Sequence, residues 1–318
     1  MKRPYSVYSR RARVLFLVAL AVLAAAGCAT WVRGRELARE YYNIANAYYD
    51  LGRFERAADY YRRALALDSG LTPAGYNLAR AYLRDKRYDD ARDVLLDLLG
   101  RDPDNLLLRE TLAYVYYLSG DIARASAQYE QMLALSPLNA NALFNLGRIA
   151  EEQDRPAAAL AYYERAAAVE GGDALLLYRY GRLLLTEQPE HAVAVFERYL
   201  DSSPRDYERV VEVGDALRRE RYFLPARRAY QMVPSNHPEQ PRALFGKAAV
   251  LLTGIQDAQL GLQTLEQALT AGYADKDAFI ALLNDRDLVA AAAVRRLLEE
   301  HQAIEVDDID ARDNGQRP

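Results

Sequence analysis

Cysteine and histidine are scarce in this chain of 318 residues, which has one cysteine and three histidines. A lone cysteine excludes a disulfide bond within the chain and leaves the redox compartment open. The histidines, His191, His237 and His301, are far apart, and no H-E-x-x-H sequence places two of them on one helix face to hold zinc. The G-x-S-x-G and P-loop patterns of hydrolases and nucleotide-binding proteins are also missing. The sequence therefore predicts a protein that is not an enzyme and that holds no cofactor or metal.

Lysine is rare too, and the basic residues are unevenly placed. Lysine occurs only at positions 2, 86, 247 and 276, so arginine supplies nearly all the positive charge. The whole chain carries a net charge of −4, whereas residues 1–27 hold five basic residues and no acidic one. The remainder is therefore more acidic than the whole. Because nucleic acid selects basic surfaces, this charge argues against a nucleic-acid partner.

A small residue returns along the chain at an almost constant spacing. The first row, with steps of 34 residues and one of 33, is Ala45, Ala79, Ala113, Gly147, Gly181, Gly214 and Ala248. A second row keeps the same register: Ala57, Ala91, Ala125, Ala159, Ala192 and Ala226. Two rows in one register indicate a tandem repeat. A repeat of this length indicates short helical units that bury their apolar faces against their neighbours.

The first repeat, residues 38–71, contains two helical stripes separated by a turn. The first stripe has residues at i, i+3, i+4 and i+7: Tyr41, Ile44, Ala45 and Tyr48. The second stripe consists of Ala57, Tyr61, Ala64 and Leu65. Between them lies Gly52, which can adopt the positive φ that a tight turn needs. Each repeat is therefore predicted to be a helix–turn–helix hairpin, in which the small residues allow the helices to approach closely.

This pattern resembles that of the tetratricopeptide repeat family, W-x2-L-G-x2-Y, then A-x3-F, then P. The A-x3-F part recurs with an aromatic or leucine at its end: Tyr61, Leu95, Tyr129, Tyr163, Phe196 and Tyr230. Prolines separate several hairpins, at positions where a helix must stop: Pro103, Pro137, Pro204 and Pro238. The fifth repeat is one residue short in its turn.

The resemblance implies an all-α fold, a right-handed superhelical solenoid of about seven hairpins within residues 38–274. Their expected bounds are 38–71, 72–105, 106–139, 140–173, 174–206, 207–240 and 241–274. The seventh departs from the pattern, since Lys247 stands where a leucine is expected and the second helix is displaced by one residue. Capping helices over 275–302 and an acidic, disordered tail over 303–318 are expected to follow.

Residues 1–27 have the features of an export signal, a basic start followed by an apolar run over 14–26. The sequence Ala-Ala-Gly-Cys ending at Cys28 resembles the lipobox of bacterial lipoproteins, in which the chain is cut before the cysteine and its thiol carries a lipid. Residues 28–37 then form a short tether. Alternatively, residues 14–32 remain as a transmembrane anchor. Both interpretations tether the repeats to a membrane outside the cytoplasm. In an envelope with two membranes, Ala29 resembles outer-membrane cargo, on the periplasmic side.

In the tetratricopeptide repeat family, the first helix of each hairpin lines a concave groove. The corresponding positions here combine aromatic, asparagine and arginine residues: Tyr42, Asn43, Asn46, Tyr76, Asn77, Arg80, Tyr114, Phe144, Asn145, Arg148, Tyr178 and Arg182. Amide groups can bond an extended peptide backbone, arginine can clasp a carboxylate, and rings supply apolar area. The other interpretation is that the asparagines brace neighbouring helices and the rings pack between hairpins.

The expected function is that of a membrane-anchored, non-enzymatic scaffold or adaptor. It would bind a peptide or helix of another cell-envelope protein in this groove, like repeat lipoproteins that help assemble envelope complexes. The alternative is a solute-binding or transport accessory protein with a small ligand in the aromatic groove. A closed pocket among Tyr76, Tyr114, Phe144 and Tyr178 favours the small ligand, whereas an open trough favours a peptide.

Overall fold

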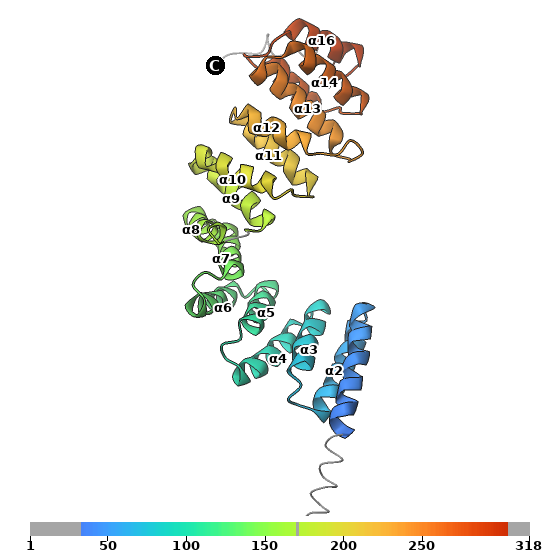
Figure 1. Ribbon diagram of the computed structural model, residues 1–318, viewed down its shortest axis with the longest axis vertical. Helices are drawn as coiled ribbons and strands as arrows, with labels where there is room; N and C mark the ends of the chain where they lie inside the picture. Colours follow the sequence, from blue (N-terminus) through green and yellow to red (C-terminus); the bar gives the residue numbers. More distant parts are fainter. Residues whose placement is uncertain (1–32, 170–171, 305–318) are drawn as a thin grey trace, which may run out of the picture. The chain divides into compact units, whose positions relative to one another are not determined.

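The structure is a computed structural model that describes residues 33–169 and 172–304, and every regular element in these two ranges is a helix (Figure 1). The chain divides into two compact units, an N-terminal unit (Met1–Ile149) and a C-terminal unit (Ala150–Pro318). The predicted all-α fold of tandem helical hairpins is confirmed. Cys28 and the rest of the expected signal and anchor, residues 1–32, lie outside the described residues.

The N-terminal unit consists of helices paired in chain order. A helix over residues 33–50 is followed by α2 (Phe54–Leu67), α3 (Thr72–Arg84), α4 (Tyr88–Arg101), α5 (Leu106–Leu118), α6 (Ile122–Leu135) and the greater part of α7 (Ala140–Glu152). The first helix already includes residues 33–37, which the sequence analysis assigned to the tether.

The C-terminal unit continues the same arrangement and ends with two additional helices. Its α-helices are α8 (Pro156–Ala167), α9 (Ala174–Glu187), α10 (Pro189–Asp201), α11 (Tyr207–Arg219), α12 (Phe223–Gln231), α13 (Gln240–Val250), α14 (Ala258–Thr270), α15 (Lys276–Leu283) and α16 (Ala291–Glu300). A short π-helix, η1 (Leu251–Ile255), separates α13 from α14.

Small residues and rings explain the close packing within each hairpin. The second row of alanines, which the sequence places on the second helices, is fully buried, and so are Tyr61, Tyr129 and Tyr163. At Gly214 on α11, an added Cβ would lie 2.7 Å from Cε1 of Tyr230 on α12. At Gly181 on α9, it would lie 2.6 Å from Cε1 of Phe196 on α10. The rings therefore pack directly against the backbone of the partner helix, and a larger residue there would separate the pair.

Most of the turns inside the hairpins contain one residue in the left-handed backbone conformation, at the same position of the repeat. Residues with positive φ at this position are Gly52, Lys86, Gly120, Asp154, Arg221 and Gln256. In the fifth hairpin the position is missing, because Gln188 alone separates α9 from α10, with φ −147°. The residue that the fifth repeat lacks is thus the left-handed residue of its turn.

The last described helices of the C-terminal unit pack around an apolar cluster. Phe245, Leu265, Phe279 and Leu298 are buried together there. Ile304 is 4% exposed and belongs to the same cluster, so the chain is packed at least to this residue, one beyond the start of the expected tail. Residues 305–318 lie outside the described part. Among the described helices, none combines the length and apolar character that crossing a membrane requires.

Candidate binding surface

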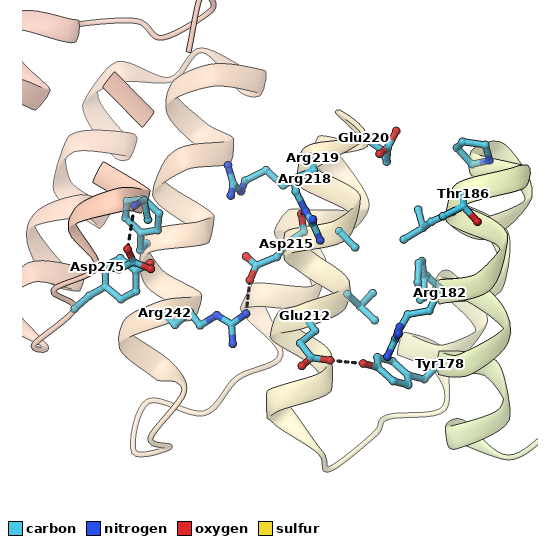
Figure 2. A pocket seen from close by; sticks show the side chains of 18 residues that line it. Tyr178, Arg182, Thr186, Glu212, Asp215, Arg218, Arg219, Glu220, Arg242 and Asp275 are labelled. Atoms are coloured by element: carbon cyan, nitrogen blue, oxygen red, sulfur yellow. Dashed lines mark hydrogen bonds and ion pairs between the residues drawn. The ribbon is translucent and has the colours of Figure 1, made fainter. Parts of the chain in front are cut away.

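The larger of two candidate sites is a hollow of about 1140 Å³ in the C-terminal unit, here called the C-terminal hollow (Figure 2). It is lined by the first helices of three hairpins, α9, α11 and α13, together with residues of α10 and α15. Aspartates fix the starts of two of these helices. Asp173 accepts a hydrogen bond from the Leu175 N–H at 2.6 Å, and Asp206 accepts one from the Arg209 N–H at 3.2 Å.

One wall of the C-terminal hollow carries a tyrosine held between arginines and a glutamate. The Tyr178 hydroxyl donates a hydrogen bond to Glu212 (Figure 2). The guanidinium groups of Arg182 and Arg209 lie 5.7 Å and 5.4 Å from the centroid of the Tyr178 ring. Burial, followed by the hydrogen bond to Glu212, raises the pKa of Tyr178 above its ordinary value. The ring is therefore fixed in place, and its hydroxyl stays neutral at physiological pH.

A second network in the hollow surrounds Asp215. Its carboxylate accepts a hydrogen bond from the Tyr230 hydroxyl at 2.7 Å and pairs with Nη2 of Arg242 at 2.7 Å. Burial, together with the Asp215 charge, raises the pKa of Tyr230 well above its ordinary value. The Asp215 carboxylate is thus engaged by groups of the protein itself.

The smaller site is a trough of about 380 Å³ in the N-terminal unit, here called the N-terminal trough. Its lining is Tyr76, Arg80, Leu83, Leu107, Glu110, Thr111, Tyr114, Tyr129 and Asn145. All but Tyr129 come from α3, α5 and α7, which are first helices of hairpins. Arg80 lies 5.8 Å from the Tyr76 ring centroid, and Tyr114 is 41% exposed. Four of the residues expected in the groove, Tyr76, Arg80, Tyr114 and Asn145, therefore line one open surface.

Other expected groove residues take part in contacts inside the N-terminal unit. The Tyr61 hydroxyl donates to Oδ1 of Asn46 at 2.5 Å, and Nδ2 of Asn77 donates to Asn46 and to the Tyr42 hydroxyl, both at 3.2 Å. Burial is the main reason that the pKa of Tyr61 rises to about 12. Asn46 and Asn77 thus join adjacent hairpins, while Asn43 is exposed and without such a bond in the described structure.

Two further expected residues, Phe144 and Arg148, lie together on α7. The Arg148 guanidinium is 6.0 Å from the Phe144 ring centroid and 5.0 Å from that of Tyr117, to whose hydroxyl it also donates at 3.0 Å. Tyr178 and Arg182 belong to the C-terminal unit and line its hollow. Of the twelve expected residues, four therefore line the N-terminal trough and two line the C-terminal hollow.

The sequence-based selection omitted several residues that line the C-terminal hollow: Glu212, Asp215, Arg218, Arg219 and Arg242. Glu212 and Asp215 occupy the same repeat positions as Asn77 and Arg80, so the repeat register alone could have identified them. Arg242 stands at the beginning of α13, outside the positions that the register singles out. No group of three His, Cys, Asp or Glu side chains within residues 33–169 and 172–304 is arranged to hold a metal ion.

Comparison with known proteins identifies the repeat. Family profiles described as tetratricopeptide repeat match residues 48–114, 111–174 and 152–207, which together span half of the chain. An uncharacterized lipoprotein of Treponema pallidum is 27% identical over 162 residues, which cover 50% of this chain and 83% of that protein. The type IV pilus assembly protein PilF of Pseudomonas aeruginosa is 26% identical over 176 residues, covering 53% and 68% of the two chains.

A solved structure supports the same assignment of fold. A tetratricopeptide repeat protein from Parabacteroides merdae superimposes with a TM-score of 0.51 at 14% identity, and the match covers 84% of this chain and 99% of that one. Such low identity is informative about the fold alone. With matching profiles over half its length and tandem helical hairpins in both units, the chain belongs to the tetratricopeptide repeat family.

Proposed function

We propose that this protein is a membrane-tethered, non-enzymatic adaptor that holds a peptide segment or helix of another cell-envelope protein against the first helices of its hairpins. The observation that carries the proposal is the N-terminal trough, where Tyr76, Arg80, Tyr114 and Asn145 line one open surface. Aromatic residues and arginine are the side chains that contribute most to protein interfaces. The open form of the trough favours an extended partner over a small enclosed ligand.

The chemistry of the N-terminal trough suits a peptide. Arg80 is exposed and stacked between Tyr49 and Tyr76, with its guanidinium 5.0 Å and 5.8 Å from the two ring centroids. Stacking restricts the guanidinium, so less conformational entropy is lost when it binds a carboxylate or a backbone carbonyl. The Asn145 amide donates to the Asn141 carbonyl at 2.8 Å and accepts Nη1 of Arg148 at 3.3 Å, which leaves its second N–H and its second lone pair for a peptide backbone.

The tether and the location rest on the sequence and on the names of two relatives. The lipobox-like sequence ending at Cys28 favours a lipid anchor, with the transmembrane alternative over residues 14–32. One relative carries the name lipoprotein and another the name pilus assembly protein, which agrees with a role in assembling an envelope complex. We place the protein on a membrane outside the cytoplasm, at the periplasmic side of the outer membrane in an envelope with two membranes.

The test combines crosslinking and purification of tagged protein from native membranes. The trough variant is Arg80→Ala with Tyr114→Ala, both exposed side chains whose truncation leaves the core intact. The matched control is Arg62→Ala with Leu67→Ala, an exposed pair on α2, a second helix. We expect a defined set of envelope proteins to be recovered with the wild type and the control and to be lost with the trough variant.

Direct binding then identifies the segment. Peptides tiling a recovered protein are titrated against purified adaptor by fluorescence anisotropy, and one of them should bind the trough variant at least tenfold more weakly than the wild type. Equal recovery by the two variants, or recovery of no defined protein, would remove the proposal and favour a small ligand. Intact mass of the mature N-terminus decides the anchor, since an acylated Cys28 identifies lipid and an uncut chain identifies a transmembrane helix.

A further inference from the structure

The N-terminal trough contains a buried tyrosine whose hydroxyl is not used by the protein itself. Tyr129 on α6 lines the trough and is 1% exposed, and its hydroxyl has no hydrogen-bond partner within residues 33–169 and 172–304. The tyrosines at the same repeat position in three other hairpins each donate to a first-helix acceptor: Tyr61 to Asn46, Tyr163 to Glu151 and Tyr230 to Asp215. A buried hydroxyl without a partner is unfavourable, so the trough favours an occupant that supplies an acceptor to Tyr129.

Tyr129 is accessible from the trough because a row of rings on the first helices is interrupted there. At one position of the repeat the residues are Tyr42, Tyr76, Glu110, Phe144, Tyr178, Val211 and Phe245. In the first hairpin, the Tyr42 ring packs against the Tyr61 ring, with the centroids 5.9 Å apart. In the third hairpin the same position holds Glu110, so no ring covers Tyr129 from there. The Tyr199 hydroxyl also lacks a partner in the described residues, but it is closed off and lines neither the trough nor the C-terminal hollow.

Glu110 supplies an acceptor beside this donor. Its carboxylate is partly buried, lines the trough and forms no ion pair or hydrogen bond with any residue that the structure describes. Burial, followed by the Glu110 charge, raises the pKa of Tyr129 above its ordinary value, which shows that the carboxylate lies near the hydroxyl. The Tyr129 hydroxyl therefore keeps its proton and can donate it, while the neighbouring carboxylate can accept a hydrogen bond.

A donor and an acceptor side by side match a peptide main chain, which presents carbonyl and N–H groups in turn. The charge of the trough agrees with such an occupant. Arg80 and Glu110 are its charged lining residues, so its formal charge is zero and it does not select a segment of either sign. Leu107 and Tyr114, which are 53% and 41% exposed, add apolar surface for the side chains next to the bound main chain.

We propose that the N-terminal trough binds the main chain of an extended, uncharged peptide segment, with a carbonyl that accepts the Tyr129 hydroxyl and an N–H that donates to Glu110. This inference rests on the proposed function, because it specifies how the trough holds its peptide. The bound carbonyl gives Tyr129 the acceptor that it lacks in the free protein, so the hydrogen bond contributes to affinity. Main-chain bonds are tolerant of sequence, so the side chains that pack on Leu107 and Tyr114 decide which segments fit.

The first test uses peptides selected from a random phage-displayed library on the full-length protein in detergent. Peptides that bind the wild type but not the trough variant, Arg80→Ala with Tyr114→Ala, are synthesised and titrated by fluorescence anisotropy. Tyr129→Phe removes one oxygen and keeps the ring. We expect it to raise the Kd of these peptides about five- to thirtyfold, because the carbonyl loses its donor. The melting temperature should equal or exceed that of the wild type, since the lost hydroxyl has no partner within the described residues.

Tyr61→Phe is the matched control, because it removes the same atom from a ring at the same repeat position. The Tyr61 hydroxyl is bonded to Asn46, and Tyr61 is not among the residues that line the trough. This variant should bind the peptides like the wild type and melt at a lower temperature. Unchanged affinity in Tyr129→Phe, or a melting temperature as low as that of Tyr61→Phe, would overturn the inference while leaving peptide binding intact. If no selected peptide depends on Arg80 and Tyr114, the proposed function fails as well.

Changes in the peptide separate main-chain contacts from side-chain contacts. Each amide of a selected peptide is replaced in turn by an ester, which removes an N–H and weakens the carbonyl as an acceptor. One ester should weaken binding to the wild type and have a smaller effect in Tyr129→Phe, because the two changes remove the same hydrogen bond. Affinity should change less than about twofold between 0.05 M and 0.5 M salt, since no ion pair is required. Equal ester effects in both proteins, or a strong dependence on salt, would contradict main-chain recognition.

Discussion

The asparagines of the N-terminal unit illustrate how one side chain can serve packing rather than recognition. Asn46 follows the small residue of the first hairpin and accepts the hydroxyl of Tyr61, a ring that is 1% exposed. Asn77 of the next hairpin donates to the same oxygen. A buried hydroxyl without a partner costs about 1–3 kcal/mol, so this arrangement stabilises the ring in the core. Asn46 therefore acts mainly on stability.

Replacing Asn46 tests this role. Asn46→Ala should lower the free energy of unfolding by about 1–3 kcal/mol, because the Tyr61 hydroxyl loses its acceptor in a buried position. Adding Tyr61→Phe removes the hydroxyl as well, and the double variant should recover part of the loss. Urea denaturation followed by circular dichroism measures both. A double variant less stable than Asn46→Ala alone would show that the hydrogen bond is not the origin of the effect.

The individual candidate residues could be predicted only in part. The repeat register correctly indicates which positions lie on the first helices, and Tyr76, Arg80, Tyr114 and Asn145 do line one trough. The repeat register does not reveal which asparagine forms a hydrogen bond inside the protein. For Asn46 this depends on Tyr61, fifteen residues away on the second helix of the hairpin. For the same reason, the pairing of Asp215 with Arg242, twenty-seven residues apart, was not foreseen.

At the scale of elements, two repeats of irregular length show how a hairpin absorbs one residue more or less. The fifth repeat lacks a residue and loses the left-handed position of its turn. The seventh has an extra residue, which η1 accommodates as a wider helical turn at the end of α13. The Gln256 N–H donates to the Leu251 carbonyl, and the Leu252 carbonyl accepts the Val289 N–H at 3.0 Å. The π-helix thus presents a carbonyl that ties down the segment before α16.

Gly254 is the residue on which this π-helix depends most. An added Cβ would lie 2.1 Å from Cγ of Phe223, the first residue of α12. Gly254→Ala should destabilise the protein by about 1–3 kcal/mol, and Phe223→Leu introduced as well should recover part of the loss because the ring is removed. Gly100→Ala is the matched control, since Gly100 in α4 has nothing within 4 Å of the added Cβ, and it should be neutral or stabilising by up to about 1 kcal/mol.

Thermal unfolding of the wild type, the two single variants and the double variant Gly254→Ala with Phe223→Leu measures these changes in stability. Equal losses from Gly254→Ala and Gly100→Ala would mean that the contact with Phe223 is unimportant. The displaced register of the seventh repeat is visible in the sequence, so an irregularity was expected there. The π-helix itself was not expected, because an extra residue can be absorbed by a longer turn, a bulge or a π-helix, and the repeat register does not distinguish among these.

At the scale of the whole molecule, one chemical feature is shared by both units, namely tyrosine in the core. Tyr61 and Tyr129 are buried in the N-terminal unit, and Tyr163, Tyr199 and Tyr230 in the C-terminal unit. Burial is the largest cause of a raised pKa at each of them. The core is therefore intolerant of charge at several points in each unit, and its stability is coupled to pH in the alkaline range.

The direction of this coupling follows from proton binding. In the unfolded chain a tyrosine loses its proton near pH 10, whereas folded Tyr61 keeps it up to about pH 12. Between these values the folded state binds more protons, so the free energy of unfolding is unaffected well below pH 10 and falls as the pH rises through this window. Each such tyrosine contributes a slope of about 1.4 kcal/mol per pH unit. The chain is well suited to the measurement because four lysines and 24 tyrosines supply nearly all the groups that titrate there.

Urea denaturation between pH 8 and 12, with tyrosinate absorbance recorded alongside circular dichroism, should reveal two classes of tyrosine. The exposed class should ionise reversibly near pH 10 while the helices persist. The buried class should ionise only together with loss of helix, because a phenolate in the core is unfavourable. Tyr61→Phe removes one group whose ionisation is coupled to unfolding. It should therefore make the fall in the free energy of unfolding between pH 10 and 12 shallower by up to about 1.4 kcal/mol per pH unit. If all tyrosines ionise near pH 10 and the helical signal is unchanged, the buried hydroxyls are accessible to solvent and the close packing of rings against the first helices is wrong.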